Sequence, residues 1–462
     1  MIRSLLLAGA GALTLAACTT VGPDYKSPAP AAPAQGAFLG TASPAFTGNE
    51  PPGRWWQLFQ DPVLDRLVAE ALAANTDLRV AAANLARARA VLREVRAGRL
   101  PSTNVSGGAS FGDQPGPGGA DTTFDAGLDV GYQVDLFGRI RRAIEASRAD
   151  VGAVQAAFDL TRVSVAAETA RAYADACSTG RQLDVARASV RIQEQTFDLT
   201  RRLVAGGRGT ALETGQAAAQ LEQTRATIPT LEAQRQTALY RLSVLTGRPP
   251  ADFPREVAAC ATPPALERPI PVGNGATLLA RRPDIRAAER ELAAATARIG
   301  VATAELYPDI ALGGSIGSTA SSLGGLVSGD GFRFSLGPLI NWSFPNTRVA
   351  RTRIAQAEAS AQAALARFDG TWVGALEETE SALTRYANGL DRVAALRRAR
   401  AGSAEAARIA RLRYRSGREP FQIVLEAERS LSQTEAALAQ AEADLSNDLV
   451  SVFLALGGGW EA

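Results

Sequence analysis

The chain has 462 residues, of which 46% are hydrophobic, 6% aromatic and 21% charged, and its 49 basic and 47 acidic side chains leave a net charge of +2. So small a net charge argues against a nucleic-acid-binding protein held to its partner by a basic surface. The sequence contains no histidine, which excludes Ser-His-Asp and Cys-His catalysis and zinc sites built on imidazole. Because no nucleophile–base set or metal cluster is evident, an enzyme is disfavoured, and we expect no catalytic residue, cofactor or metal.

The N-terminal residues have the features of a targeting signal. Arg3 forms a short basic region, residues 5–15 are apolar, and the run ends in the letters LAAC at Cys18, as in a secretory signal peptide. These four letters resemble a bacterial lipobox, in which the cysteine is acylated and the peptide is cut before it. We therefore expect residues 1–17 to be removed and Cys18 to be lipidated. An ordinary secretory signal with a chance cysteine is the alternative.

The residues after Cys18 predict an extended leader on an outer-membrane protein. Thr19 stands where an aspartate usually retains lipoproteins in the inner membrane, so the outer membrane is favoured. Residues 18–54 are rich in Pro, Ala and Gly and show little periodicity. No later segment has the roughly 18–20 consecutive apolar residues of a membrane helix. Any further membrane contact must come from acyl chains or from strands.

The rest of the chain contains an internal repeat. Residues 75–107 align with residues 282–314 without a gap, and near the end of each half Gly207 matches Gly417 and Gly247 matches Gly457. Matches of this density over two segments indicate a tandem duplication. We assign residues 55–250 to the first repeat and residues 280–462 to the second.

Each repeat begins with a helix and two strands. The helices are predicted at residues 77–100 and 284–307, each closed by a proline that cannot continue it. Turn-rich segments separate the strand-like runs. The four predicted strands are residues 103–111, 124–135, 309–318 and 332–342.

Each repeat then continues into a helical hairpin. Residues 138–204 and 347–414 contain no proline, and at 1.5 Å per residue each would form a helix about 100 Å long. After a short break the chain returns as a second helix, predicted at residues 210–246 in the first repeat and at residues 420–456 in the second. Pro229 lies inside the first of these and predicts a kink.

The last helix carries a heptad repeat. Apolar residues recur every seven positions at Val424, Leu431, Leu438, Leu445 and Val452. This spacing predicts coiled-coil packing with left-handed supercoiling. The alternative, an amphipathic helix on a globular core, does not accommodate two hairpins of this length.

The strands predict an oligomer. Four strands of about ten residues suit a bilayer crossing but cannot close a barrel, and open sheet edges are not tolerated in lipid. Three copies would supply twelve strands. Within the second strand, Phe124, Ala126, Leu128, Val130 and Tyr132 alternate with small or polar residues, which is typical of a lipid-facing surface.

Five motifs, in order, resemble those of one family. They are CTTVGPDYKSP at residues 18–28, WWQLFQDP at 55–62, DLFGR at 135–139, RPDI at 282–285 and ALGGGW at 455–460. They are similar to the motifs of the TolC-like outer-membrane efflux proteins, and specifically of the NodT-type lipoproteins that serve resistance-nodulation-division (RND) pumps. The resemblance covers essentially the whole mature chain.

The resemblance implies a mainly α fold with a small β part. It implies a homotrimer in which a 12-stranded transmembrane β-barrel, four strands per protomer, continues into a periplasmic α-barrel of coiled-coil hairpins. Residues 251–279 would be an equatorial linker. The implied partners are outer-membrane lipid, a periplasmic membrane-fusion adaptor and an inner-membrane RND transporter, with no nucleic acid.

The implied function is the passive exit duct of an efflux pump for small molecules such as drugs or metal ions. The exit duct of a type I protein-secretion system is the alternative, and a purely structural lipoprotein is disfavoured by the strand pairs. The exported substrate cannot be read from the sequence, because such a conduit accepts what its pump delivers.

The resemblance also assigns roles to the hairpin tips. In the family, acidic rings and tyrosine–acid–arginine links close the periplasmic end, and matching on the tip glycines assigns Glu213 and Glu426 to acidic gate positions and Tyr414 to the gate tyrosine. The chain departs from the pattern of the family's best-known member at Ile423, where a second acid would stand, and at Glu419, where an arginine would. Arg418 or Arg208 is the candidate to replace that arginine. The expected adaptor-docking residues are Gly207, Arg208, Arg415, Ser416 and Gly417. The alternative for Glu426 and Tyr414 is an ordinary coiled-coil surface.

Two cysteines remain after lipidation. Cys177 lies 30 residues before Gly207, which places it roughly 45 Å above the tip. The returning helix ends above that level, and the 15 residues from Leu245 to Cys260 could come back to it. Since the periplasm permits disulfides, Cys177 and Cys260 are either bonded at the equatorial level or two buried free thiols.

Overall fold

The computed structural model describes residues 20–29, 32–113, 120–266 and 268–459. It divides into two compact units, and each draws on both halves of the chain, so the units do not coincide with the two repeats. Of the described residues, unit 1 comprises those within 20–29, 83–156 and 286–371, and unit 2 comprises those within 32–82, 157–285 and 372–459. The lipidation candidate Cys18 and the residues before it lie outside the described residues.

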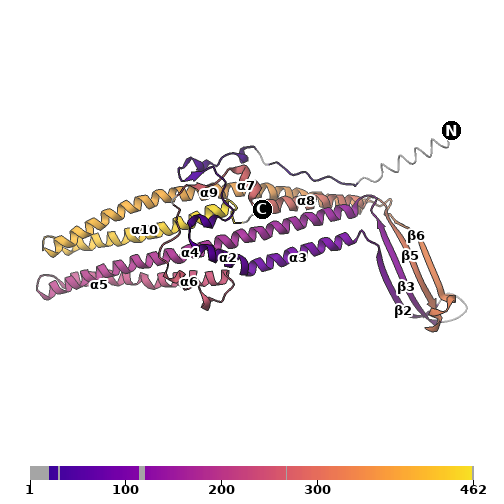
Figure 1. Ribbon diagram of the computed structural model, residues 1–462, viewed down its shortest axis with the longest axis horizontal. Helices are drawn as coiled ribbons and strands as arrows, with labels where there is room; N and C mark the ends of the chain where they lie inside the picture. Colours follow the sequence, from indigo (N-terminus) through magenta and orange to yellow (C-terminus); the bar gives the residue numbers. More distant parts are fainter. Residues whose placement is uncertain (1–19, 30–31, 114–119, 267, 460–462) are drawn as a thin grey trace. The chain divides into compact units, whose positions relative to one another are not determined.

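Unit 1 contains one antiparallel sheet of four strands in the order β2-β3-β5-β6, drawn side by side in Figure 1. The strands are β2 (Ser102–Asp113), β3 (Ala120–Val134), β5 (Asp309–Ala320) and β6 (Phe332–Asn341). The central pairing of β3 with β5 joins the two repeats. The four predicted strands are confirmed, and most extend by a few residues because the ladder continues into their turns.

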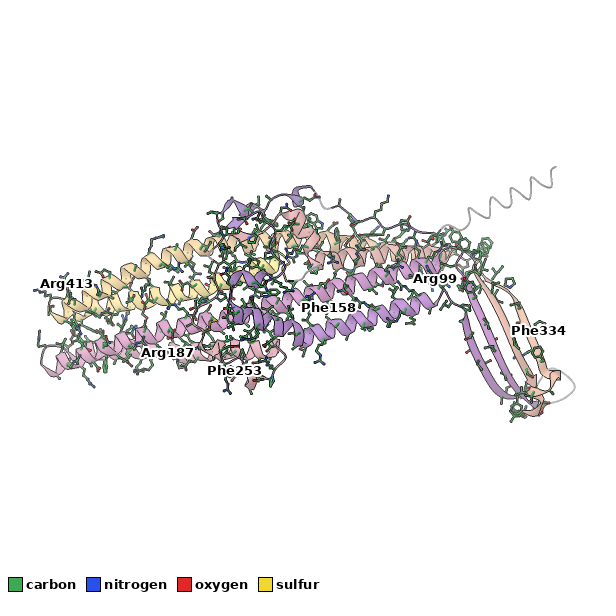
Figure 2. The ribbon with its side chains drawn as sticks, viewed as in Figure 1. Arg99, Phe158, Arg187, Phe253, Phe334 and Arg413 are labelled. Carbon is green, nitrogen blue, oxygen red and sulfur yellow. A yellow bond between two sulfur atoms is a disulfide. The ribbon has the colours of Figure 1, made fainter. Side chains whose placement is uncertain are left out.

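The register gives the sheet two faces of different polarity. Directly opposed residues share a face, so the pairs Val105–Leu128 and Leu128–Ile316 mark an apolar face. Phe334 of β6 belongs to this face and is three-quarters exposed, and its side chain is labelled in Figure 2. Apart from the exposed Leu339 of β6, the opposite face is built from small and polar residues, among them Ser106, Asp125, Asp129, Ser315 and Ser335.

Four helices of unit 1 adjoin the sheet in sequence. They are most of α3 (Thr76–Ala97) and of α8 (Pro283–Ala304) and the first parts of α4 (Arg139–Ala205) and α9 (Arg348–Arg415). The Asp135 carboxylate caps the N-terminal end of α4, because it accepts hydrogen bonds from the backbone amides of Ile140 and Arg141, both over 2.9 Å. An acidic group at this end satisfies amides that have no partner within the helix.

Unit 2 holds the rest of α4 and α9 and the helices that return beside them. The returning helices are α5 (Ala211–Arg225) and α6 (Thr227–Leu245) in the first repeat and α10 (Phe421–Ala455) in the second. The break between α5 and α6 is at Ala226, close to Pro229, whose missing amide and ring disfavour the preceding turn. None of the described helices is long and apolar enough to cross a membrane.

The sequence did not predict the small elements of unit 2. The predicted leader and linker contain a two-residue parallel ladder between β1 (Phe46–Thr47) and β4 (Ile270–Pro271). The short helices α2 (Pro62–Ala74) and α7 (Gly275–Arg281) cover the same region. The two-residue strands and the seven-residue α7 carry too little periodicity to be recognised from sequence. Helix α2 was overlooked although its pattern is helical, because its buried residues Leu64, Leu67, Val68 and Ala71 recur at helical spacing.

The main hydrophobic core of unit 2 explains two of the motifs. Trp55 is fully buried and stacks on Phe453 of α10, with ring centroids 4.8 Å apart. Arg282 donates to Asp284 over 2.7 Å and to Glu378 over 2.8 Å. Burial alone would lower the pKa of Arg282, but these two carboxylates raise it above its usual value. The arginine therefore stays charged and ties α8 to α9.

Candidate functional site

Both hairpin tips lie in unit 2 and end in the same turn. Gly207 and Gly417 have φ angles of +70° and +69°, a left-handed conformation that glycine adopts without a Cβ clash. The amides of Arg208 and Arg418 then donate over 2.8 and 2.9 Å to the carbonyl five residues earlier. This is the Schellman arrangement, which satisfies the last carbonyls of a helix. The tip glycines therefore have a structural role in both repeats.

The candidate gate residue Glu213 caps a helix. It lies in the first turn of α5, where its carboxylate accepts from the amide of Thr210 over 3.0 Å. Its own amide donates to the Thr210 hydroxyl over 3.3 Å. This reciprocal capping box fixes the start of the returning helix.

The candidate gate residue Tyr414 is buried at the end of α9. Its ring lies 5.6 Å from that of Phe421, and both belong to a small apolar cluster with Ala217, Val424 and Leu425. Burial, and next the nearby carboxylate of Glu213, raise the pKa of Tyr414. Among the described residues, however, its hydroxyl has no hydrogen-bond partner. The expected tyrosine–acid–arginine link is therefore not formed within the described chain.

The other tip candidates are exposed. Glu426, Arg208, Arg415, Ser416 and Arg418 are all solvent-accessible. The Arg208 guanidinium lies 3.6 Å from the position that a Cβ on Gly417 would take, so the two tips lie beside each other.

An ion pair closes the second tip. The Arg413 guanidinium, labelled in Figure 2, lies 2.9 Å from the carboxylate of Glu419. Glu419, which departs from the pattern of the family's best-known member, is thus the partner of an arginine.

A buried polar cluster above the tips escaped the sequence reasoning. Glu428 of α10 is 4% exposed and accepts from the Thr196 hydroxyl of α4 over 2.6 Å. Arg411 of α9 reaches the same oxygen over 3.3 Å. Burial raises the pKa of Glu428, while Thr196 and Arg411 oppose the rise. One carboxylate therefore joins three helices of both hairpins.

The signal for this cluster is present in the heptad helix. Glu428 lies four residues after Val424 and three before Leu431, so a charged residue interrupts the apolar stripe. A charge at such a position needs a partner when it is buried.

A disulfide joins Cys177 of α4 to Cys260, with their Cα atoms 4.7 Å apart. Cys177 is fully buried. A Cβ on Gly180 would lie 2.1 Å from the Cys260 carbonyl oxygen, so the linker approaches α4 only because this residue is glycine. Arg235 of α6 donates to the same carbonyl over 3.0 Å. These contacts fasten the linker to the long helix.

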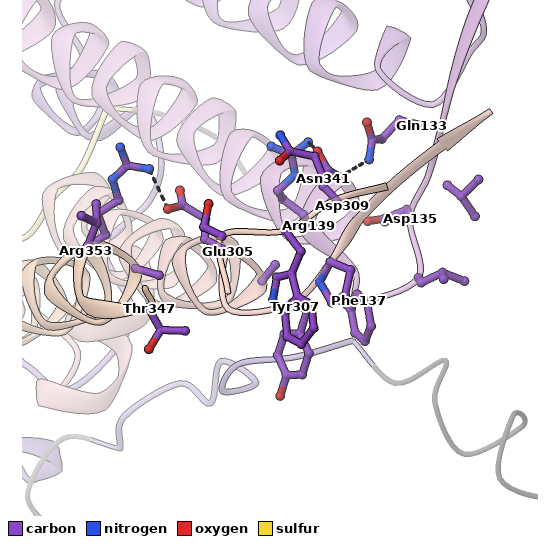
Figure 3. A pocket seen from close by; sticks show the side chains of 18 of the residues that line it. Gln133, Asp135, Phe137, Arg139, Glu305, Tyr307, Asp309, Asn341, Thr347 and Arg353 are labelled. Carbon is purple, nitrogen blue, oxygen red and sulfur yellow. Dashed lines mark hydrogen bonds and ion pairs between the residues drawn. The ribbon is translucent and has the colours of Figure 1, made fainter. Parts of the chain in front are cut away.

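A cavity of about 450 Å³ lies in unit 1 where the sheet meets its helices. Figure 3 shows the rings of Phe137 and Tyr307 against each other, stacked with centroids 4.5 Å apart. The charged side chains that line this cavity are already paired, as in the 2.7 Å contact of Arg353 with Glu305. Across the described parts of the chain, no group of His, Cys, Asp or Glu could hold a metal ion.

A sheet with one apolar and one polar face and two long helical hairpins are features of an outer-membrane channel protein. The sequence profile of the family described as "Outer membrane efflux protein" matches residues 67–248 and 275–458. The chain belongs to this family, which confirms the resemblance seen in its motifs.

Individual proteins of known sequence or structure are similar over nearly the whole chain. Nodulation protein T of Rhizobium leguminosarum bv. trifolii is 30% identical over 452 residues, covering 97% of this chain and 96% of the relative. Outer membrane protein OprJ of Pseudomonas aeruginosa is 32% identical, with coverages of 97% and 95%. The solved outer-membrane channel OprN superposes with a TM-score of 0.90 at 37% identity, covering 96% of this chain and 100% of that one.

Proposed function

We propose that the protein is the outer-membrane exit duct of a tripartite efflux pump, through which small molecules pass passively. The observation that carries the proposal is the open, two-faced sheet. Among the described residues, β2 and β6 each pair with a single strand, so the sheet has two free edges. Free edges are not tolerated in lipid, and another copy of the chain offers matching ones.

The strand count favours a homotrimer. Three copies of the four-stranded sheet would give a barrel of twelve strands, wide enough for a lumen. Each strand has 10–15 residues, and about 9–11 tilted residues cross a bilayer. The apolar face would contact lipid and the polar face would line the conduit. The matching order of helices and strands in the two halves supports a tandem duplication.

The exposed tips suit docking to a periplasmic adaptor, which would connect the duct to an inner-membrane RND transporter. Gly207, Arg208, Arg415, Ser416 and Gly417 form this adaptor-docking surface. All are solvent-exposed.

The gate is proposed to be formed by Glu213, Tyr414, Glu426 and Arg418, with contacts from neighbouring copies. Three copies of Glu426 around one axis would attract cations. We expect Glu426→Gln to reduce cation preference in planar-bilayer recordings, and Tyr414→Phe combined with Glu213→Ala to raise conductance. Parental conductance and selectivity in both variants would contradict these gate roles.

The anchor is proposed to be an acylated Cys18, because two or three acyl chains hold a protein in a membrane where one does so only marginally. Radiolabelled palmitate should mark the wild-type protein and not Cys18→Ser. Persistent label on the variant would exclude the lipobox assignment.

The assembly is tested by purifying the tagged protein from cross-linked cells. Native mass spectrometry should give a trimer, and an adaptor and an RND transporter should co-purify. A monomer in mild detergent would contradict the duct. Co-purification with an ATP-driven protein exporter would instead support type I secretion.

A further inference from the structure

The described part of the leader lies against unit 1 in an extended conformation. The amide of Val21 donates to the carbonyl of Phe137 over 3.2 Å. Thr20 approaches Gly138 so closely that a Cβ on Gly138 would lie 2.6 Å from the methyl carbon of Thr20. The leader therefore meets the body where β3 ends and α4 begins.

A buried arginine holds the next residues. The Arg142 side chain is 5% exposed, and its Nε donates to the Val21 carbonyl over 3.1 Å. One terminal nitrogen donates to the Gly22 carbonyl over 3.2 Å and to the Asp24 carboxylate over 2.7 Å. The other donates to Glu145 of its own helix over 2.8 Å. A guanidinium in this fork makes several bonds with little loss of freedom per bond.

The leader residues that contact Arg142 occupy a position on unit 1 that we call the seat. On the side of the seat opposite Arg142, two glycines approach each other closely. A Cβ on Gly22 would lie 2.3 Å from the Cα of Gly300 in α8. A Cβ on Gly300 would in turn lie 2.7 Å from the Arg142 side chain and 2.9 Å from the Val21 carbonyl oxygen. Only a leader without a side chain at position 22 fits between the two helices.

The seat continues along α8. The hydroxyls of Tyr25 and Ser27 both donate to Glu289, over 3.1 and 3.0 Å. The Tyr25 ring packs against a small apolar cluster of α8 and α9 that includes Leu292 and Ala364. Specific side chains of the leader are thus recognised over eight residues.

We propose that Phe137, Gly138, Arg142, Glu289 and Gly300 form a binding site for the chain's own leader, in which Arg142 is the positioning residue. Its role is to fix the point at which the acylated N-terminus enters the membrane. The proposal rests on the proposed lipidation of Cys18, two residues before Thr20. If the leader were not docked, the nine residues 19–27 would let the acylated N-terminus move by up to about 30 Å. The docked leader instead holds the acylated N-terminus near the end of the sheet.

The sequence offers a direct probe, because Lys26 is the only lysine in the chain. Endoproteinase Lys-C therefore has one site, in the middle of the docked segment. Cleavage requires the segment to leave its seat, so its rate reports docking. We expect detergent-solubilised trimers of Gly22→Ala and Arg142→Ala to be cut at least about tenfold faster than wild type, with unchanged heat resistance of the trimer.

Two variants serve as matched controls. Arg148→Ala removes an exposed arginine from the same helix, and no hydrogen bond or ion pair joins it to the described leader residues. Gly48→Ala adds a Cβ that meets nothing within 4 Å. Both should be cut at the wild-type rate.

Equal rates for wild type and Gly22→Ala would overturn the proposal even if Arg142→Ala does not fold, because Gly22 lies on the leader itself. The mass of the released peptide reports acylation separately. Release of an unacylated peptide with the expected rates would reject lipidation and leave the docking site intact.

Discussion

The Thr196–Glu428 contact gives a sharp prediction about the tips. Thr196→Val removes the hydroxyl that donates over 2.6 Å to the buried Glu428 carboxylate and keeps the shape of the side chain. A hydrogen bond to a charged group contributes about 1.5–3 kcal/mol. Arg411 remains as a partner, but at 3.3 Å and with its side chain 30% exposed. Local opening of the hairpins should therefore become easier.

The expected size follows from this loss. A change of 1.5–3 kcal/mol raises the population of the open state by about 10- to 150-fold. Hydrogen exchange measured by mass spectrometry should accelerate by this factor in peptides from the ends of α4 and α10. Peptides from the sheet should be unaffected, because mutational effects of this kind are local.

Thr200→Val is the matched control, since Thr200 lies one turn further on the same helix and is fully buried. Its hydroxyl donates only to the carbonyls of Thr196 and Phe197, over 3.1 and 2.8 Å. Those carbonyls belong to the helix ladder, so we expect a loss below about 1 kcal/mol. Equal acceleration in the two variants would refute the assigned role of Glu428.

Further predictions concern pH, the core and the disulfide. Burial raises the pKa of Glu428 in the folded chain above its ordinary value, so its protonation stabilises the folded tip. This contribution to stability is fully present below the pKa of the unfolded state and is lost as pH rises through the pKa of the folded state. Glu428→Gln should therefore flatten this part of the stability–pH profile measured by thermal unfolding. An unchanged profile would contradict the role assigned to Glu428. Trp55→Ala empties the site stacked on Phe453 and should cost about 3–5 kcal/mol in chemical denaturation; a loss below about 1 kcal/mol would exclude the core role. Neither Cys177 nor Cys260 should react with iodoacetamide in the unreduced, unfolded protein, and labelling of both thiols would exclude the bond. Replacing both cysteines removes a cross-link that spans 83 residues, which should lower the free energy of unfolding by roughly 4–5 kcal/mol in the chain-entropy model.

The sequence was most informative where local chemistry decides the outcome. Proline and glycine punctuation gave the order of helices and strands, because these residues limit backbone conformation whatever surrounds them. Alternation around Leu128 assigned the apolar face of the sheet, because the period of a strand is fixed. The repeat then placed Gly207 and Gly417 at corresponding tips.

The site was less predictable, because a role copied from a family motif says nothing about which neighbours a side chain meets. Glu213 occupies its expected position but caps a helix, and the Tyr414 hydroxyl has no partner among the described residues. Glu428 was overlooked, since its importance comes from burial between helices more than 200 positions apart in sequence.

Short-range patterns in the sequence are therefore enough to predict the family, the element order and the two faces of the sheet. The three-dimensional structure was needed to show that the Cys177–Cys260 bond forms, that Glu428 is buried, and that Arg142 holds the leader. Each of these depends on the close approach of segments far apart in the chain. Such approaches are set by the packing of whole helices, which no local pattern encodes.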